Sequence, residues 1–435
     1  MVHRLVRAVA IFIAATSLLY NSIYAQLQVS VTVDRSRPIH VFDPATTLGA
    51  AIDGHDVGEI GRRLRPPYVR QMLEAGLGPI TYRLRTELGN EAWHWNTRGK
   101  FSDSIRQQGY WTGSTDPTPG GISLANGYRL PRRGNTTDEA NNDGYSRIDD
   151  GDPRTFWKSN PYLDHAFTHD EDSMHPQWVV IDLGYDPVPV NGIRIVWGDQ
   201  FATDYEVEYS AEDLSSDYGL RPDKGWQKLQ SGTVTGSKRD NSVHRLAPQP
   251  VTARFIRITL RKAAHAGRLS PDPRDNVGFA IRELYIGAIN AHGVLADSVH
   301  PGTTNHTQST VYVSSTDPWH TAADLDRNEE HAGFDRLVAT GLTRGLPMMV
   351  PVGILYDTPA NAAAEIKYLI NRGIKIDRIE LGEEADGQNV NALDYAALYV
   401  QFADAIHNVA PDAKLGGPSF QDIVANLIDR KEGAG

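Results

Sequence analysis

The pattern of apolar and polar positions changes twice along the chain. In residues 26–117, and again in residues 291–435, short apolar runs alternate with stretches whose apolar residues recur at helical spacing. In residues 118–290 the helical period disappears, and short alternating runs are separated by Gly, Pro, Asn and Asp. The first pattern is typical of a parallel sheet covered by helices, and the second of a β-sandwich or jelly roll. The predicted fold class is therefore α/β plus all-β.

Five apolar runs are predicted to be parallel strands of the α/β part, two before the sandwich and three after it. They cover residues 47–53, 79–85, 347–355, 376–384 and 414–419. Helices are expected at residues 67–76, 334–342, 362–372 and 394–407. Before the third of these, Thr358-Pro359 has the form of an N-cap followed by Pro at the first helical position. A (β/α)8 TIM barrel needs eight strands. We therefore expect an incomplete barrel that the sandwich interrupts, in a chain that is a truncated version of a longer protein.

The first 25 residues are predicted to be a signal peptide. Arg4 and Arg7 give a basic start, residues 8–19 are apolar, and Ala25 offers a cleavage site. The apolar stretch is too short to cross a bilayer, and no other run is long enough. The sequence thus predicts a secreted or periplasmic protein with no membrane span.

Composition excludes several kinds of chemistry. The chain contains no cysteine, so disulfides, thiolate zinc sites and a cysteine nucleophile are ruled out. Its formal net charge is −11, which is a poor electrostatic match for nucleic acid or anionic lipid.

The candidate chemistry lies at the end of the fourth predicted strand, in the run Glu380-Leu-Gly-Glu-Glu384. Carboxylates at the C-terminal end of a barrel strand lie where barrel enzymes act, and paired carboxylates are what glycoside hydrolysis uses. The run is similar to the Gly-Asn-Glu strand end of retaining glycoside hydrolases of the clan A barrel type, heparanase-like families included. The resemblance implies that Glu384 is the general acid/base. Glu383 stands where that family has Asn, which departs from the pattern.

Other residues at predicted strand ends could line a sugar pocket, or could be structural. The substrate-binding candidates are Asp53, His55, Arg83, Asn90, Trp93 and Tyr356, with Arg85, His94 and Asp357 beside them. The family nucleophile is a Glu on the seventh strand, and no residue of this chain is assigned to it. No cofactor is expected for catalysis.

The central segment resembles the discoidin family, the coagulation-factor C-type fold that many sugar-binding modules share. The resemblance is carried by four pieces in order, at residues 149–159, 177–184, 193–210 and 255–287. In that family the first loop often holds a structural calcium. The matching oxygen ligands are Asp150, Asp152, Thr155 and Glu283. The same residues could instead be ordinary turn formers.

Two functions fit the sequence. The first is a secreted retaining glycoside hydrolase that cleaves O-glycosidic bonds and carries an inserted module for binding a poly- or oligosaccharide. The alternative is a non-catalytic carbohydrate-binding or adhesion protein with a degenerate barrel as scaffold. A downstream continuation with three more βα units and a Glu at the seventh strand would favour the enzyme.

Overall fold

The computed structural model describes residues 36, 50–52, 55–77, 80–82, 91–129, 147–216, 219–220, 225–266, 270–300, 309–325, 329–385 and 389–419. The chain divides into two units, Met1–Thr47 and Leu48–Gly435, and the described helices and strands all belong to the second. No helix among the described residues combines the length and apolar character that a membrane span requires. The predicted signal peptide lies outside the described residues.

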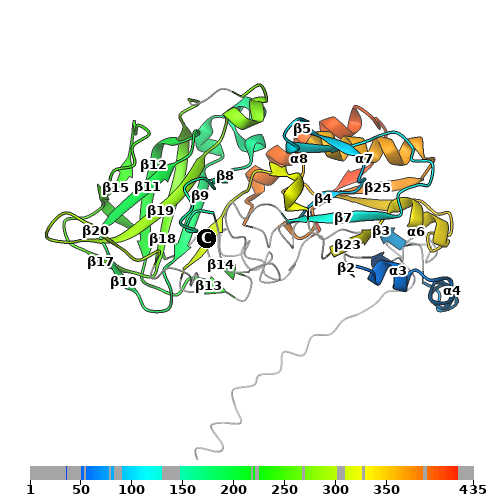
Figure 1. Ribbon diagram of the computed structural model, residues 1–435, viewed down its shortest axis with the longest axis horizontal. Coiled ribbons are helices and arrows are strands. Elements are labelled where there is room, and N and C mark those ends of the chain that lie inside the picture. Colours follow the sequence, from blue (N-terminus) through cyan, green and yellow to red (C-terminus); the bar gives the residue numbers. More distant parts are fainter. Residues whose placement is uncertain are drawn as a thin grey trace, which may run out of the picture. The chain divides into compact units, whose positions relative to one another are not determined.

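The central segment forms a sandwich of two antiparallel sheets (Figure 1). One sheet runs in the order β15 (Gln227–Val234), β12 (Ala202–Ser210), β18 (Phe255–Ala263), β9 (Gln177–Asp182) and β21 (Thr310–Val313). The other runs in the order β16 (His244–Arg245), β11 (Gly192–Trp197), β19 (Ala280–Ile289) and β20 (Leu295–Asp297), with β8 (Trp157–Lys158) also pairing with β19. Two short antiparallel pairs complete it, β10 (Val188–Val190) with β17 (Val251–Ala253), and β13 (Ser215–Ser216) with β14 (Gly219–Leu220).

The alternating sequence pattern explains which side chains fill the sandwich. Along β18, Ile256, Ile258 and Leu260 are fully buried in the core between the sheets, whereas Arg257 and Arg261 lie on the opposite face. Successive side chains of a strand point to opposite faces, so a period of two buries one face and leaves the other polar. The predicted β-sandwich is therefore present.

The sandwich reaches further along the chain than the range 118–290. Strand β21 adds to the edge of the five-stranded sheet, and Val311 and Val313 are buried in its core. At the other end, β7 (Leu124–Arg129) pairs with β4 (Glu91–His94) and β23 (Glu329–Ala332) instead of joining the sandwich. Local periodicity identifies strands but not their partners, which explains both differences.

The five predicted parallel strands are all found in the described residues. Strand β1 (Ala50–Ile52) pairs with β3 (Ile80–Tyr82), and β24 (Met348–Val352), β25 (Ile376–Leu381) and β26 (Leu415–Gly416) form a second parallel sheet. Strand β3 lies beside β24. The described strands form two short sheets and do not show a closed barrel. We call these strands and their helices the parallel-strand region.

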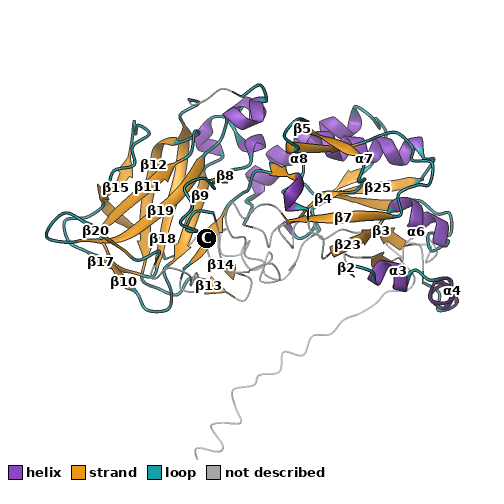
Figure 2. Cartoon of the chain, viewed as in Figure 1, coloured by secondary structure: helices purple, strands orange, loops and turns teal. Residues whose placement is uncertain are grey.

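Helices connect the strands of this region (Figure 2). They are α3 (Glu59–Arg63), α4 (Pro66–Glu74), α6 (Phe334–Thr340), α7 (Pro359–Asn371) and α8 (Ala392–His407). Helix α7 begins as its sequence predicts, because the Thr358 hydroxyl accepts from the Asn361 amide and Pro359 occupies the first position. It ends before Gly373, whose φ is 69°.

Antiparallel strands that the sequence analysis did not predict also belong to this half of the molecule. They form one sheet in the order β2 (His55–Asp56), β23, β7 and β4, and another in the order β22 (His320–Thr321), β6 (Gln108–Gly113) and β5 (Gly99–Asp103). Strand β2 lies between the first and second parallel strands in the sequence, and the others lie between the second and third, so they are insertions between βα units.

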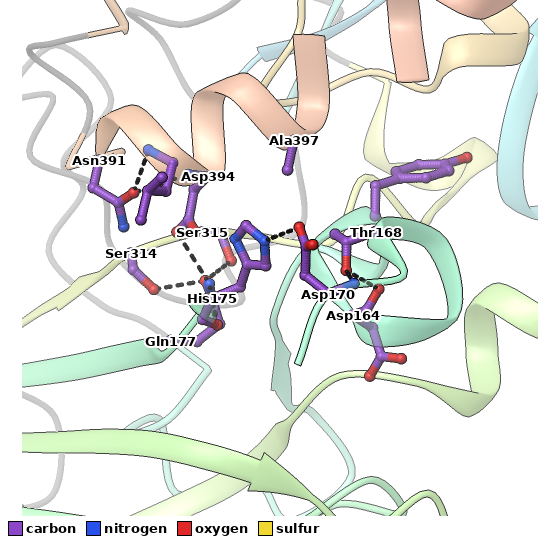
Figure 3. Close-up of polar contacts among 12 residues, drawn as sticks. Asp164, Thr168, Asp170, His175, Gln177, Ser314, Ser315, Asn391, Asp394 and Ala397 are labelled. Carbon is purple, nitrogen blue, oxygen red and sulfur yellow. Dashed lines mark hydrogen bonds and ion pairs between the residues drawn. The ribbon is translucent and has the colours of Figure 1, made fainter. Parts of the chain in front are cut away.

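Buried hydrogen bonds join the sandwich to α8 (Figure 3). The Asp394 carboxylate of α8 accepts from His175 Nδ1 at 2.8 Å and from Gln177 Nε2 at 3.2 Å. The side-chain Oε1 of Gln177 in turn accepts from the hydroxyls of Ser314 and Ser315 at 2.8 and 2.6 Å. Gln177 lies 217 residues from Asp394 and 137 residues from Ser314, so the contact depends on both regions being folded.

Candidate functional site

Three acidic residues and one serine lie at the C-terminal ends of two neighbouring parallel strands. Glu380 is the fifth residue of β25, and Glu383 and Glu384 directly follow that strand. Glu383 forms an isolated parallel bridge with Ser419, which follows β26, and the Glu384 amide donates to the Ser419 carbonyl at 2.8 Å. The Ser419 hydroxyl donates to Glu380 Oε1. The predicted strand-end placement of Glu383 and Glu384 is thus observed.

Burial differs among these carboxylates. Glu380 and Glu383 are buried, and Glu384 is only partly so. Glu380 Oε2 has no hydrogen-bond partner among the described residues. A buried carboxylate oxygen that lacks a donor is costly, so this strand end is a candidate for a functional site.

The backbone of Glu384 is also unusual, with a φ of 51°. A non-glycine residue in the left-handed region costs of order 1 kcal/mol and is seen mainly where surrounding structure enforces it. Here the bond from its amide to Ser419 holds that conformation. Such outliers concentrate at functional sites, which makes Glu384 the best-supported candidate in the cluster.

Tyr356 and Asp357 lie in the turn between the neighbouring strand β24 and helix α7, and both are buried. The Asp357 carboxylate accepts from the Thr358 amide at 2.6 Å, and both its oxygens accept from Asn361 Nδ2 at 3.0 Å. Asn361 Oδ1 in turn accepts from Trp95 Nε1 at 3.0 Å. Asp357 therefore organises the start of α7, and the structural reading of this residue is the better one.

The remaining sugar-pocket candidates divide by what the structure describes. Asp53, Arg83, Arg85 and Asn90 lie outside the described residues. His55 and Trp93 belong to β2 and β4, but their side chains are not described.

His94 is described and lies in a buried aromatic cluster. Its ring stacks on Trp111 with centroids 3.9 Å apart, and its Nε2 lies 3.3 Å from His320 Nε2. Burial lowers the pKa of His94 well below its ordinary value, and it lowers the pKa of His320 to about 3. Both rings are neutral at pH 7, which fits packing better than sugar contact.

The predicted calcium ligands lie close together in part. Thr155 Oγ1 donates to Asp150 Oδ2 at 2.8 Å, and burial, aided by the nearby Asp150 carboxylate, raises the pKa of Glu283 to about 7. Asp152 is instead held by Arg154. Among the described residues, no three His, Asp or Glu side chains are arranged to hold a metal ion. The calcium site stays a prediction, with Asp150, Thr155 and Glu283 as its better-placed members.

Sequence reasoning missed two contributors to the strand-end cluster. The sequence pattern identifies Ser419 only as part of a strand and loop, and Glu380 only as part of the motif. The available signal was topological, since consecutive parallel strands end at the same edge of a sheet. A polar residue after the fifth strand should therefore lie near the carboxylates of the fourth.

Comparison with known proteins identifies the sandwich. Residues 134–270 match the family model of the F5/8 type C domain. This match, with the observed sheets, confirms the predicted discoidin-like domain. No curated protein matches the chain.

Three solved structures are similar to about a third of the chain. Chitosan-binding module 1 of a chitosanase/glucanase from Paenibacillus sp. IK-5 is 19% identical, over 34% of this chain and 87% of that one, with a TM-score of 0.22. CpGH89CBM32-5 from Clostridium perfringens, in complex with GalNAc-β-1,3-galactose, is 18% identical over 34% and 86%, with a TM-score of 0.22. CBM32 of AlyQ, in complex with 4,5-unsaturated mannuronic acid, is 19% identical over 32% and 82%, with a TM-score of 0.21.

Proposed function

We propose that this chain is a carbohydrate-active protein whose sandwich binds a saccharide. The observation that carries the proposal is the match of residues 134–270 to the F5/8 type C domain family, in a segment that folds as a two-sheet sandwich. Many sugar-binding modules have this fold. The chain's net charge of −11 disfavours nucleic acid and anionic lipid as ligands. A protein that begins with a signal peptide and is secreted or periplasmic would meet such ligands directly.

Affinity electrophoresis in gels that contain soluble polysaccharides tests this proposal. We expect retardation of the intact chain in at least one gel that contains a polysaccharide, relative to a gel without one. A globular protein of similar size and charge provides the control for sieving. Unchanged mobility in neutral and acidic polysaccharides alike would reject saccharide binding.

We further propose that the parallel-strand region belongs to a retaining glycoside hydrolase in which Glu384 is the general acid/base. In that mechanism the acid protonates the glycosidic oxygen as the bond to the sugar breaks, and then deprotonates the water that releases the sugar. The second carboxylate of such enzymes lies about 5–5.5 Å away and attacks the anomeric carbon. Supporting features are the strand-end position of Glu384, its positive φ and the cluster with Glu380, Glu383 and Ser419.

Hydrolysis by Glu384→Gln tests the catalytic proposal. If the wild-type protein hydrolyses a glycoside, Glu384→Gln should lower turnover of an unactivated substrate by about 10²-fold or more. Glu365→Gln, on helix α7, tests whether the loss results simply from neutralising a carboxylate of this region. Full activity of Glu384→Gln would reject the assignment.

The second candidate function is non-catalytic saccharide binding on a barrel scaffold. The feature that favours it is Glu383, which occupies the position of the family's Asn. That Asn hydrogen-bonds the sugar 2-hydroxyl, and an ionised Glu can accept such a bond but cannot donate one. Glu383→Asn discriminates the two functions, because it should raise hydrolysis in an enzyme and leave a pure binder inactive.

A further inference from the structure

An open polar groove lies between the β5–β6 hairpin and helix α7, away from the strand-end cluster in sequence. Its volume is about 610 Å³. The hairpin contributes two cationic side chains, Arg98 and Lys100, and four hydroxyls, from Thr97, Thr112, Ser114 and Thr115. Helix α7 contributes Ala364, whose small side chain leaves the space open. Strand β6 of the hairpin contacts α7.

Hydrogen bonds from both sides fix the walls of this groove. Asn361 Oδ1 on α7 accepts from the Gly113 amide at 2.8 Å, and Asn371 Nδ2 donates to the Thr115 carbonyl at 2.9 Å. Within the hairpin, Asn96 Nδ2 donates to the Ser114 carbonyl and Asn96 Oδ1 accepts from the Arg98 amide, both at 2.9 Å. The groove is therefore formed before any ligand arrives, which lowers the entropic cost of binding.

Two glycines that face each other across the hairpin leave space for the indole rings packed beneath it. Gly99 and Gly113 are direct cross-strand partners, and a Cβ on either would collide with an indole ring, Trp111 at the first and Trp95 at the second. Both tryptophans are buried. The indoles thus support the hairpin from below, and no aromatic ring of the described residues lines the groove itself.

The charge of the groove contrasts with that of the chain. The described lining residues include no carboxylate, although acidic residues outnumber basic ones 54 to 43 in the whole sequence. Among the described residues, neither Arg98 nor Lys100 forms an ion pair, and Arg98 Nη1 donates to the Thr118 hydroxyl at 3.3 Å. At the far end of the same hairpin, Arg106 pairs with Asp103 at 3.0 Å. The two groove cations therefore remain available to an anion.

We propose that this groove binds an acidic saccharide, in which a carboxylate or sulfate group pairs with Arg98 and Lys100. Charge-assisted hydrogen bonds to such groups are the strong ones, and an Arg guanidinium matches their geometry. The hairpin hydroxyls supply donors and acceptors for sugar hydroxyls, and the volume is in the range of ligand sites. The saccharide class rests on the proposed function, whereas the requirement for negative charge rests on the groove alone.

Isothermal titration calorimetry with the intact chain tests the inference. The probes are tetragalacturonic acid, its fully methyl-esterified form, which keeps the sugar but removes the charge, and sodium sulfate. The test variant is Arg98→Gln/Lys100→Gln. The matched control, Arg106→Gln/Lys262→Gln, removes the same charge from exposed positions outside the groove.

We expect the acid to bind the wild type at least tenfold more tightly than the ester. The groove variant should lose about tenfold in affinity for the acid, because two exposed charge contacts together contribute about that factor. The control variant should lose little affinity, because its substitutions lie outside the groove. Raising the salt concentration should weaken acid binding in the wild type more than in the groove variant, because ions screen exposed charges.

Other outcomes overturn the inference in distinguishable ways. If acid and ester bind equally and the groove variant changes neither, saccharide binding by the sandwich stands and the groove proposal fails. If sulfate binds but the acid is no better than sulfate, the groove is a simple anion site. If neither saccharide binds, the proposed function fails as well. Melting temperatures of all variants, measured alongside, separate lost binding from lost folding.

Discussion

The sandwich and the parallel-strand region build their cores in different ways. The sandwich core takes its buried side chains from one continuous segment, between Ile148 and Val313. The core of the parallel-strand region spans Ile60 to Ile406 and includes Tyr162 and Leu163 from within the sandwich segment. One region can therefore complete its core from local sequence, whereas the other needs both flanking segments and part of its neighbour.

Strand length differs in the same sense. Strands β12, β18 and β19 have 9, 9 and 10 residues, whereas the parallel strands β1, β3, β24, β25 and β26 have between 2 and 6. Long antiparallel strands form many ladder bonds with one another, while short parallel strands depend on helices packed over them. The comparison indicates that the sandwich is the autonomous unit and the parallel-strand region the dependent one.

The largest expected effect comes from separating the sandwich at two different boundaries. A fragment of residues 147–316 should fold alone, whereas residues 118–290 should be less stable by roughly 5 kcal/mol. The 118–290 fragment lacks β20 and β21 and the buried side chains of Val299, Val311 and Val313, each of which contributes roughly 1.5–3 kcal/mol. Urea unfolding followed by circular dichroism measures the difference. Equal stability of the two fragments would show that these edge strands are dispensable.

The same contrast explains what could be predicted from sequence. The alternation along β18 and the Thr358-Pro359 start of α7 are local signals, and both were predicted. The pairing of β7 with β4 and β23 was not, because partner choice depends on tertiary packing.

The candidate site shows the same division. The strand-end position of Glu383 and Glu384 follows from the local change from apolar to acidic residues. The bond from the Ser419 hydroxyl to Glu380, 39 residues away, has no local signature, and neither does the bond outside the site from His175 to Asp394, 219 residues away. Sequence reasoning therefore finds residues at strand ends, but not which distant groups meet them.

Removing the buried acceptor between the two regions should affect the dependent one more. Asp394→Ala leaves His175 and Gln177 without their acceptor in a buried site, and breaking such a pair costs about 3 kcal/mol. We expect the loss of stability to lower the melting temperature of the parallel-strand region, measured by differential scanning calorimetry. The matched control is Asp404→Ala, on the exposed side of the same helix. Identical thermograms for the two variants would mean that the buried network does not couple the regions.

Calcium provides a test confined to the sandwich. If Asp150, Thr155 and Glu283 hold the ion, free calcium at about 100 times its dissociation constant should stabilise the sandwich by about 2.7 kcal/mol and leave the other transition unchanged. EDTA should reverse the shift, and Glu283→Gln should abolish it. Glu212→Gln, at an exposed position of the sandwich, is the control. The absence of any calcium-dependent shift in the wild type would contradict the predicted site.

The smallest expected effect is a pH dependence of the link between the regions. Burial disfavours the charged ring of His175, but its hydrogen bonds to Asp394 and Asp170 outweigh burial and raise the pKa of His175 above its ordinary value of 6.5. A pKa that is higher in the folded state means that this stabilisation is fully present below about pH 6.5 and is lost as the pH rises through the folded-state pKa. Burial also raises the pKa of Asp394. The protonation of Asp394 changes the stability at acidic pH, whereas the ionisation of His175 changes it at neutral to basic pH.

Melting temperatures between about pH 6 and pH 9 provide the measurement. In the wild type, the melting temperature of the parallel-strand region should fall with rising pH. The fall should be larger than in His175→Gln, which lacks the ionisable ring. His292→Gln, an exposed substitution within the sandwich, should retain the wild-type slope. Because His175 meets α8 at its Asp394, a slope confined to the sandwich transition would place the titrating group elsewhere. Equal slopes in all three proteins would show that the ionisation of His175 does not strengthen the link.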